Sequence, residues 1–317
     1  MARTRLIIDT DPGVDDAVAI LLALASEELE VLALTSVAGN VDVDKTTLNA
    51  RRLLDLAGRA DVLVARGCAA PLVGELDDAG DVHGLDGLGD IEWPDPVTPE
   101  SPEHAVDLIA RLANEGPLTI AAIGPLTNLA VLLARYPGIE SRVERVVIMG
   151  GSSFAGNVTA AAEFNIWCDP EAAARVLSGA WPITLMPLDL THQATLGDED
   201  LDYLRGLGTE VGRRTAAILE PYAAYHDQWY GNRDVIMHDA MTIYELLVPD
   251  AIDKQGVHVT VETGGEFTRG ETVIDRRRGH AASPTRVGVR LDNDRFVAFL
   301  RERLARYPLS RFEPVDQ

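Results

Sequence analysis

Short apolar runs of strand length alternate with longer segments of helical periodicity along most of this chain. The strand-like runs are residues 6–8, 31–37, 118–123, 145–149 and 183–186. The helical segments are residues 14–25, 46–56, 126–135 and 170–177. Because this alternation is typical of βαβ units, it predicts an α/β fold with an open, mainly parallel, Rossmann-like sheet flanked by helices.

The second half of the chain departs from this alternation. Residues 198–247 have mostly helical periodicity, residues 257–261 and 285–289 resemble strands, and a helix is expected over residues 294–306. No repeat, low-complexity stretch or linker divides the sequence, so we expect one domain spanning residues 1–317. The Pro/Gly-rich segment 79–102 is predicted to be a long loop beside a functional site, since long loops in compact domains are often functional.

Composition and charge exclude several classes of partner. The 317 residues are 46% hydrophobic and 25% charged, close to an ordinary soluble globular protein. A net charge of −22 argues against nucleic-acid polymers and anionic membranes, because like charges repel. Two cysteines are too few for a disulfide framework, and no apolar run reads as a signal peptide or bilayer span. These features predict a soluble, cytoplasmic protein.

Polar breaks follow four of the predicted strands. Asp9-Thr10-Asp11 ends the first strand, Gly39-Asn40 follows the second, residues 124–128 follow the strand at 118–123, and Gly150-Gly151 follows Met149. In open α/β sheets, ligands bind beyond the carboxyl ends of the strands. The four breaks therefore predict one pocket at this edge of the sheet.

Four carboxylates lie within eight residues at the first of these breaks. They are Asp9, Asp11, Asp15 and Asp16, around a Pro-Gly turn that opens a helix. Helix capping explains one or two of them, but four crowded carboxylates repel unless a cation or a shared proton compensates. Oxygen ligands without clustered Cys or His indicate a hard cation, Ca²⁺ or Mg²⁺, rather than zinc, and several protein oxygens favour Ca²⁺.

Ordered motifs along nearly the whole chain resemble the inosine–uridine-preferring nucleoside hydrolase family. The first is the acidic segment Asp9-Thr10-Asp11-Pro12-Gly13-Val14-Asp15-Asp16-Ala17. The others are Ala38-Gly39-Asn40, His83-Gly84 with Asp86-Gly87-Leu88, residues 124–128, Met149-Gly150-Gly151, Gly156-Asn157, Glu163-Phe164-Asn165 with residues 166–170, and His238-Asp239. A lone Asp-x-Asp is a weak signal, whereas this many ordered blocks are highly specific.

The resemblance implies a calcium site and a mechanism. Asp11, Asp16 and Asp239 would bind Ca²⁺ through their carboxylates, and Ile123 through its backbone carbonyl. Asp15 would then take a proton from a metal-bound water. The family relationship also implies a homodimer or homotetramer that acts on small-molecule nucleosides.

The remaining site residues are assigned by the same resemblance. The ribose would contact Asn40, Met149, Asn157, Glu163 and Asn165. The base would contact an aromatic-rich helix through Tyr222, His226 and Tyr230, and the bulk of Tyr222 and His226 favours purine or broad specificity. His83 either contacts the base or only serves a glycine-rich turn. The other histidines outside the motifs, His104, His192, His258 and His280, are expected to be surface or packing residues.

The chemistry of N-glycosidic cleavage fits these residues. Cleavage builds positive charge on the sugar, which carboxylates stabilise, and negative charge on the departing base, which needs a proton donor. His238 by itself would read as a histidine packed at a helix start, but its position beside Asp239 favours the leaving-group acid. Two alternatives remain open: a haloacid-dehalogenase-like Mg²⁺ phosphatase with an Asp-x-Asp motif, and a non-catalytic nucleoside-binding protein.

Overall fold

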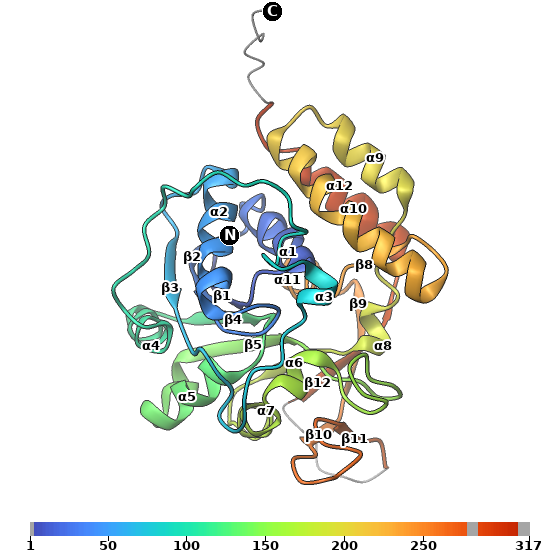
Figure 1. The fold of residues 1–317 in the computed structure, drawn as a ribbon. Helices are drawn as coiled ribbons and strands as arrows, with labels where there is room; N and C mark the ends of the chain where they lie inside the picture. The colour runs from blue at the N-terminus through green and yellow to red at the C-terminus, as the bar shows by residue number, and fades with distance from the viewer. Residues whose placement is uncertain (1–2, 278–284, 310–317) are drawn as a thin grey trace, which may run out of the picture.

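The computed structural model describes residues 3–277 and 285–309 (Figure 1). Its main sheet has eight strands in the order β3-β2-β1-β4-β5-β6-β12-β9. In chain order their bounds are β1 Thr4–Thr10, β2 Leu29–Ser36, β3 Leu63–Arg66, β4 Leu118–Ala122, β5 Val143–Met149, β6 Ile183–Met186, β9 Ile252–Gly256 and β12 Thr285–Leu291. Two small sheets pair β10 (His258–Val261) with β11 (Thr272–Asp275), and β7 (Thr195–Leu196) with β8 (Val235–Ile236).

Helices connect most of the strands. Those of the first half are α1 Val14–Leu24, α2 Val43–Ala57, α3 Gly80–His83, α4 Ala105–Glu115, α5 Thr127–Arg135 and the 3-10 helix η1 Ile139–Arg142. Those of the second half are α6 Phe164–Cys168, α7 Pro170–Leu177, α8 Leu188–Thr191, α9 Asp198–Gly206, α10 Glu210–Tyr230, α11 Ala240–Leu247 and α12 Asn293–Leu304. Among the described residues, no helix combines the length and apolar character needed to cross a bilayer.

The predicted mainly parallel sheet is confirmed. All neighbouring pairs from β3 to β12 run parallel, and only the edge strand β9 pairs antiparallel with β12. The expectation did not include β3 or β9, because the first is short and the second, Ile-Asp-Lys-Gln-Gly, lacks an apolar run. The strand predicted at residues 257–261 corresponds to β10, which belongs to a separate hairpin.

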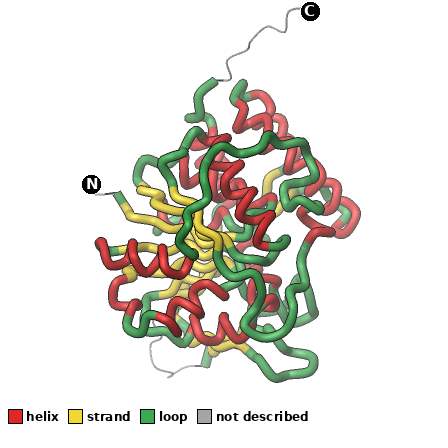
Figure 2. The backbone as a smooth tube through the Cα atoms, turned by 60° about the vertical axis from the view of Figure 1, so that its left-hand side comes forward, coloured by secondary structure: helices red, strands yellow, loops and turns green. Residues whose placement is uncertain are grey.

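Each face of the sheet is covered by its own helices (Figure 2). Successive side chains of a strand point to opposite faces, so Leu6 and Ile8 join one apolar cluster and Ile7 joins the other. The first cluster includes residues of α1, α2 and α9 to α12, and the second includes residues of α4, α5 and α7. The sheet is thus buried on both sides, as expected for parallel strands.

The strand order reverses next to β1, which lies between β2 and β4. Connections from these strands leave on opposite sides, and such a switch point opens a crevice at the carboxyl edge. Asp11 follows β1 at this point, and Ile123 follows β4. The topology therefore places the acidic segment at the natural ligand-binding position of this fold.

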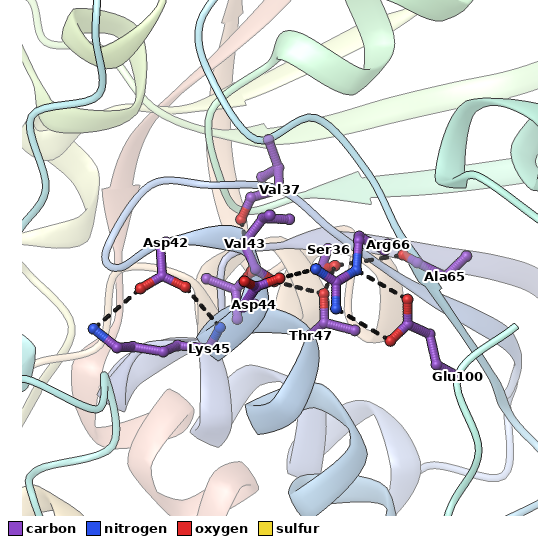
Figure 3. Close-up of polar contacts among 11 residues, drawn as sticks. Ser36, Val37, Asp42, Val43, Asp44, Lys45, Thr47, Ala65, Arg66 and Glu100 are labelled. Atoms are coloured by element: carbon purple, nitrogen blue, oxygen red, sulfur yellow. Dashed lines mark hydrogen bonds and ion pairs between the residues drawn. The ribbon is translucent and has the colours of Figure 1, made fainter. Parts of the chain in front are cut away.

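The connection between β2 and α2 is fixed by polar contacts on both sides (Figure 3). Asp42 caps α2 by accepting a hydrogen bond from the Lys45 backbone N–H at 3.0 Å. The Ser36 hydroxyl, at the end of β2, lies 2.7 Å from that of Thr47 on α2. Arg66, at the end of β3, pairs with Asp44 and Glu100. These contacts hold the turn that carries Asn40.

Candidate active site

A cavity of about 370 Å³ opens at the carboxyl edge of the sheet. Most of the predicted site residues line it: Asp15, Asp16, Asn40, His83, Ile123, Met149, Asn157, Glu163, Asn165, Tyr222, His226, His238 and Asp239. Asp11 is fully buried and does not reach the wall. Tyr230 ends α10, and its side chain lies outside the described part of the structure.

Three carboxylates meet at the base of this cavity. Asp15 and Asp16 come from the first turn of α1, and Asp239 is the N-cap residue of α11. One oxygen from each lies within 4.8 Å of those of the other two, and all three side chains are buried. Residues far apart in the sequence therefore supply one compact set of oxygen ligands.

Asp11 lies beside this set in a tightly packed position. Its Oδ2 accepts a hydrogen bond from the Asn40 backbone N–H at 2.7 Å, whereas its buried Oδ1 has no hydrogen-bond partner among the described residues. Glycine is required on both sides, since a Cβ at Gly39 would come 2.1 Å from Oδ2 and one at Gly124 would come 2.5 Å from Oδ1. A buried carboxylate oxygen without a donor needs a cation or a proton.

Burial raises the pKa values of Asp11, Asp15, Asp16 and Asp239, and repulsion from neighbouring carboxylates adds to this for Asp11, Asp15 and Asp239. Burial is the largest cause for each, and it raises the pKa of Asp15 to about 7. The charge of Asp16 raises the pKa values of Asp11 and Asp15 further, and the charge of Asp15 raises that of Asp239. A divalent cation would favour the charged forms again, so the residues present fit a metal site.

Asp16 has a structural role as well as a place in the cluster. Its Oδ2 accepts hydrogen bonds from the Gly13 backbone N–H at 3.0 Å and from the Asn40 amide at 3.1 Å. Its Oδ1 accepts one from the Thr10 hydroxyl at 2.5 Å. The capping interpretation of the acidic segment is therefore correct for Asp16, and these donors also orient its carboxylate toward the cluster.

The predicted ribose contacts form a second wall of the cavity. The Asn165 amide donates hydrogen bonds to the carbonyls of Ile123 at 3.0 Å and Met149 at 3.2 Å. Glu163 caps α6 and also accepts from the Gly151 backbone N–H at 2.8 Å. Burial raises the pKa of Glu163 to about 7. Asn157 accepts a hydrogen bond from the Phe164 backbone N–H at 3.0 Å.

The opposite wall carries aromatic rings. His83 stacks on Tyr222 with ring centroids 5.8 Å apart, and Tyr222 meets His226 edge to face at 4.6 Å. The Nδ1 atom of His83 accepts a hydrogen bond from the Val14 backbone N–H at 3.2 Å. Burial lowers the pKa of His83 to about 4, so the ring is neutral at pH 7 and its proton is on Nε2.

His238 also lines the cavity, next to Asp239 in the sequence. Its Nδ1 is 2.7 Å from the hydroxyl oxygen of Thr191, the last residue of α8. Burial lowers its pKa well below the usual value, and the neighbouring His192, His226 and His83 lower it further. The ring is therefore neutral at neutral pH, and it can act on a base as a hydrogen-bond donor.

The expectation for His192 is wrong. His192 lines the cavity, with its ring centroid 5.6 Å from that of His238. The sequence held no signal for this, because α8 is only four residues long and matches no motif. Of the other histidines, His104 caps α4 and His258 is exposed on β10, whereas His280 lies outside the described residues.

Sequence reasoning also missed part of the acidic lining. Asp77, Asp78 and Asp81 line the cavity from the segment around α3. With Asp15, Asp16, Glu163 and Asp239 they give it seven carboxylates, and none of the described lining residues is Lys or Arg. This negative wall disfavours anionic ligands unless a cation is bound.

Comparisons with known proteins give a consistent result. Residues 6–298 match the family model described as inosine-uridine preferring nucleoside hydrolase. A relative from Photobacterium profundum, named pyrimidine-specific ribonucleoside hydrolase RihA, is 44% identical, and the alignment covers 95% of this chain and 99% of the relative. A relative of the same name from Shewanella woodyi is 43% identical over 95% of this chain and 98% of its own length.

Solved structures agree with the sequence relatives. A plant nucleoside hydrolase superposes with a TM-score of 0.88 at 36% identity, covering 95% of this chain and 99% of that one. A purine-preferring ribonucleoside hydrolase from Gardnerella vaginalis gives a TM-score of 0.91 at 31% identity, with 95% and 98% covered. The phosphatase alternative is therefore wrong. The chain belongs to the inosine–uridine preferring nucleoside hydrolase family and is an N-ribosyl hydrolase of ribonucleosides.

Proposed function

We propose that this enzyme is a Ca²⁺-dependent ribonucleoside hydrolase in which Asp15 activates the attacking water. The observation that carries the proposal is the meeting of Asp15, Asp16 and Asp239 at the base of a cavity that His238 also lines. Asp11, Asp16, Asp239 and the Ile123 carbonyl would hold the ion. The resemblance to the family assigns Asp15 to the attacking water.

The choice of calcium follows from the donor set. Every proposed ligand is a carboxylate or carbonyl oxygen, which hard cations prefer, and Ca²⁺ accepts more oxygen ligands in a more flexible geometry than Mg²⁺. The bound ion would bind the ribose hydroxyls and would lower the pKa of the attacking water.

The residues of the chain divide the reaction between two ends of the cavity. Asp15 takes a proton from the water while the oxygen of that water attacks C1′. The carboxylates stabilise the positive charge on the ribose. The C1′–N bond breaks with its electron pair on the base. The neutral His238 ring donates a hydrogen bond to the departing base. Asp15 then releases to solvent the proton that it took from the water, and the base takes up one proton from solvent, so the reaction consumes one water.

The range of bases is proposed from two observations. Tyr222 and His226, which meet edge to face on the cavity wall, favour purine or broad specificity by their bulk. The relatives with 43% to 44% identity are named pyrimidine-specific. We therefore propose a broad range that includes pyrimidine ribonucleosides.

A panel of substrates tests the proposed function. We expect inosine, adenosine, guanosine, uridine and cytidine to yield reducing sugar, and no substrate to yield inorganic phosphate. The kcat/KM for ribonucleoside 5′-monophosphates should be lower than that for the nucleosides by a factor of at least about ten. The reason is repulsion between the phosphate and the seven carboxylates of the cavity. Added salt should reduce the difference in kcat/KM between nucleosides and their 5′-monophosphates, because it screens the repulsion. Release of inorganic phosphate, or no reducing sugar from any nucleoside, would contradict the proposal.

The proposed metal site can also be tested by measuring the stability of the protein. Without a cation, the raised pKa values mean that the folded protein holds protons more tightly than the unfolded chain, so its stability should fall as the pH rises through about 7. Added Ca²⁺ should raise the unfolding midpoint at pH 7.5, because it binds only the folded site.

Asp11→Asn should lower Ca²⁺ affinity at least about 10-fold. Stoichiometric zinc in the purified protein, or full activity after exhaustive chelation, would refute the calcium site.

A further inference from the structure

We infer that Thr191 is a positioning residue that fixes the tautomer and orientation of His238, so that Nε2–H is the donor presented to the departing base. This inference rests on the proposed role of His238. Its basis is the 2.7 Å contact between the Thr191 hydroxyl and Nδ1 of His238. Thr191 is not among the described residues that line the cavity, so it would act through the histidine ring.

The direction of this hydrogen bond follows from the partners of Thr191. A threonine hydroxyl can donate one hydrogen bond and can also accept, and Nδ1 of a neutral histidine does one or the other. Thr191 is fully buried, and among the described residues its Oγ1 has no partner other than Nδ1. If Nδ1 carried the proton, the hydroxyl proton would be left buried without an acceptor, which is costly. The satisfied arrangement has Thr191 donating to Nδ1.

The Nε2 atom of His238 must then be a hydrogen-bond donor. With Nδ1 accepting, the proton of the neutral ring is on Nε2, which has no hydrogen-bond partner among the described residues. His238 lines the cavity, so the unpaired Nε2–H is the group available to a ligand. The opposite tautomer would offer a lone pair there, and a lone pair repels the electron pair that collects on the base.

Helix α8 holds Thr191 in place. The Leu188 backbone N–H, at its start, donates to the Gly151 carbonyl at 2.9 Å. Asp189 accepts a hydrogen bond from the Ser153 backbone N–H at 2.6 Å, and the Gln193 side chain, just past the helix, donates to the Val289 carbonyl at 3.2 Å. A short helix fixed at both ends can hold a hydroxyl at one position, which is what tautomer selection needs.

The kinetic test compares Thr191→Val, Thr191→Ser and His238→Ala on uridine and on 4-nitrophenyl riboside, whose phenolate leaves without help. Thr191→Val should lower kcat on uridine about tenfold, the cost of one hydrogen bond, and leave the activated riboside within twofold. Thr191→Ser should restore most of the loss. The matched control is Thr215→Val, which removes a buried hydroxyl that has no hydrogen-bond partner in the described part of the chain. The turnover of both substrates should be unaffected.

The outcomes separate this inference from the role of His238. If His238→Ala slows only uridine while Thr191→Val slows neither substrate or both equally, the tautomer inference alone is wrong. If His238→Ala slows both substrates equally, the proposed role of His238 fails, and the inference falls with it.

A second measurement does not depend on activity. The ¹⁵N NMR spectrum of the imidazole nitrogens, assigned by comparison with His238→Ala, should show Nε2 protonated and Nδ1 unprotonated in the Ca²⁺-bound wild-type protein. In Thr191→Val the two tautomers should become mixed. A wild-type ring protonated at Nδ1 would overturn the inference even if the valine variant did not fold.

Discussion

Asp15→Asn is expected to retain bound Ca²⁺ and to lose about 10²–10⁴-fold in kcat, the usual contribution of a positioned general base. The amide keeps the shape of the side chain but cannot accept a proton from water. Asp15 and Asp16 both line the cavity, but Asp16 also accepts hydrogen bonds from Thr10, Gly13 and Asn40. This difference in surroundings is why we assign proton transfer to Asp15 and ligation to Asp16.

The matched comparison is Asp16→Asn, which makes the same chemical change one residue along the chain. This variant should weaken Ca²⁺ binding as well as activity, because its carboxylate is assigned to the ion. Calcium content by elemental analysis and kcat on uridine distinguish the two variants. A metal-free Asp15→Asn protein would mean that Asp15 is a ligand, as its grouping with Asp16 and Asp239 allows, and that the roles of the neighbouring Asp15 and Asp16 are reversed.

His238→Ala is expected to slow hydrolysis of uridine or inosine about 10²–10³-fold, a loss typical of removing one donor to a developing anion. The same variant should turn over 4-nitrophenyl riboside at nearly the wild-type rate. A natural base leaves poorly as an anion and needs the donor, whereas a nitrophenolate is stable by itself. Ca²⁺ binding should be unchanged, since His238 is not among the proposed ligands.

Equal losses on both substrates would contradict this assignment. They would mean that His238 positions the sugar or supports Asp239, its neighbour in sequence. Normal turnover of uridine and inosine would move the donor to another ring of the same wall. His83, whose Nε2 carries the proton, and His226 are then the next residues to replace.

Local sequence determined the acidic part of the site. Asp11, Asp15 and Asp16 lie within one strand end and one helix turn, so their spacing alone brings them together. The alternation of strands and helices also predicted the parallel sheet, and strand ends of a parallel sheet meet at one edge. These predictions succeeded because periodicity and turns between adjacent elements depend on neighbouring residues.

The tertiary structure alone decided the surroundings of His238. Its ring meets Thr191 and His192, which are more than forty residues away and belong to no recognised motif. Asp77 and Asp78 also line the cavity, although the loop predicted beside the site begins only at residue 79. Contacts between distant segments depend on how helices such as α8 pack, and no periodicity or spacing within either segment encodes that packing. The residue types at the site could therefore be read from the sequence, whereas the partner that orients each one required the fold.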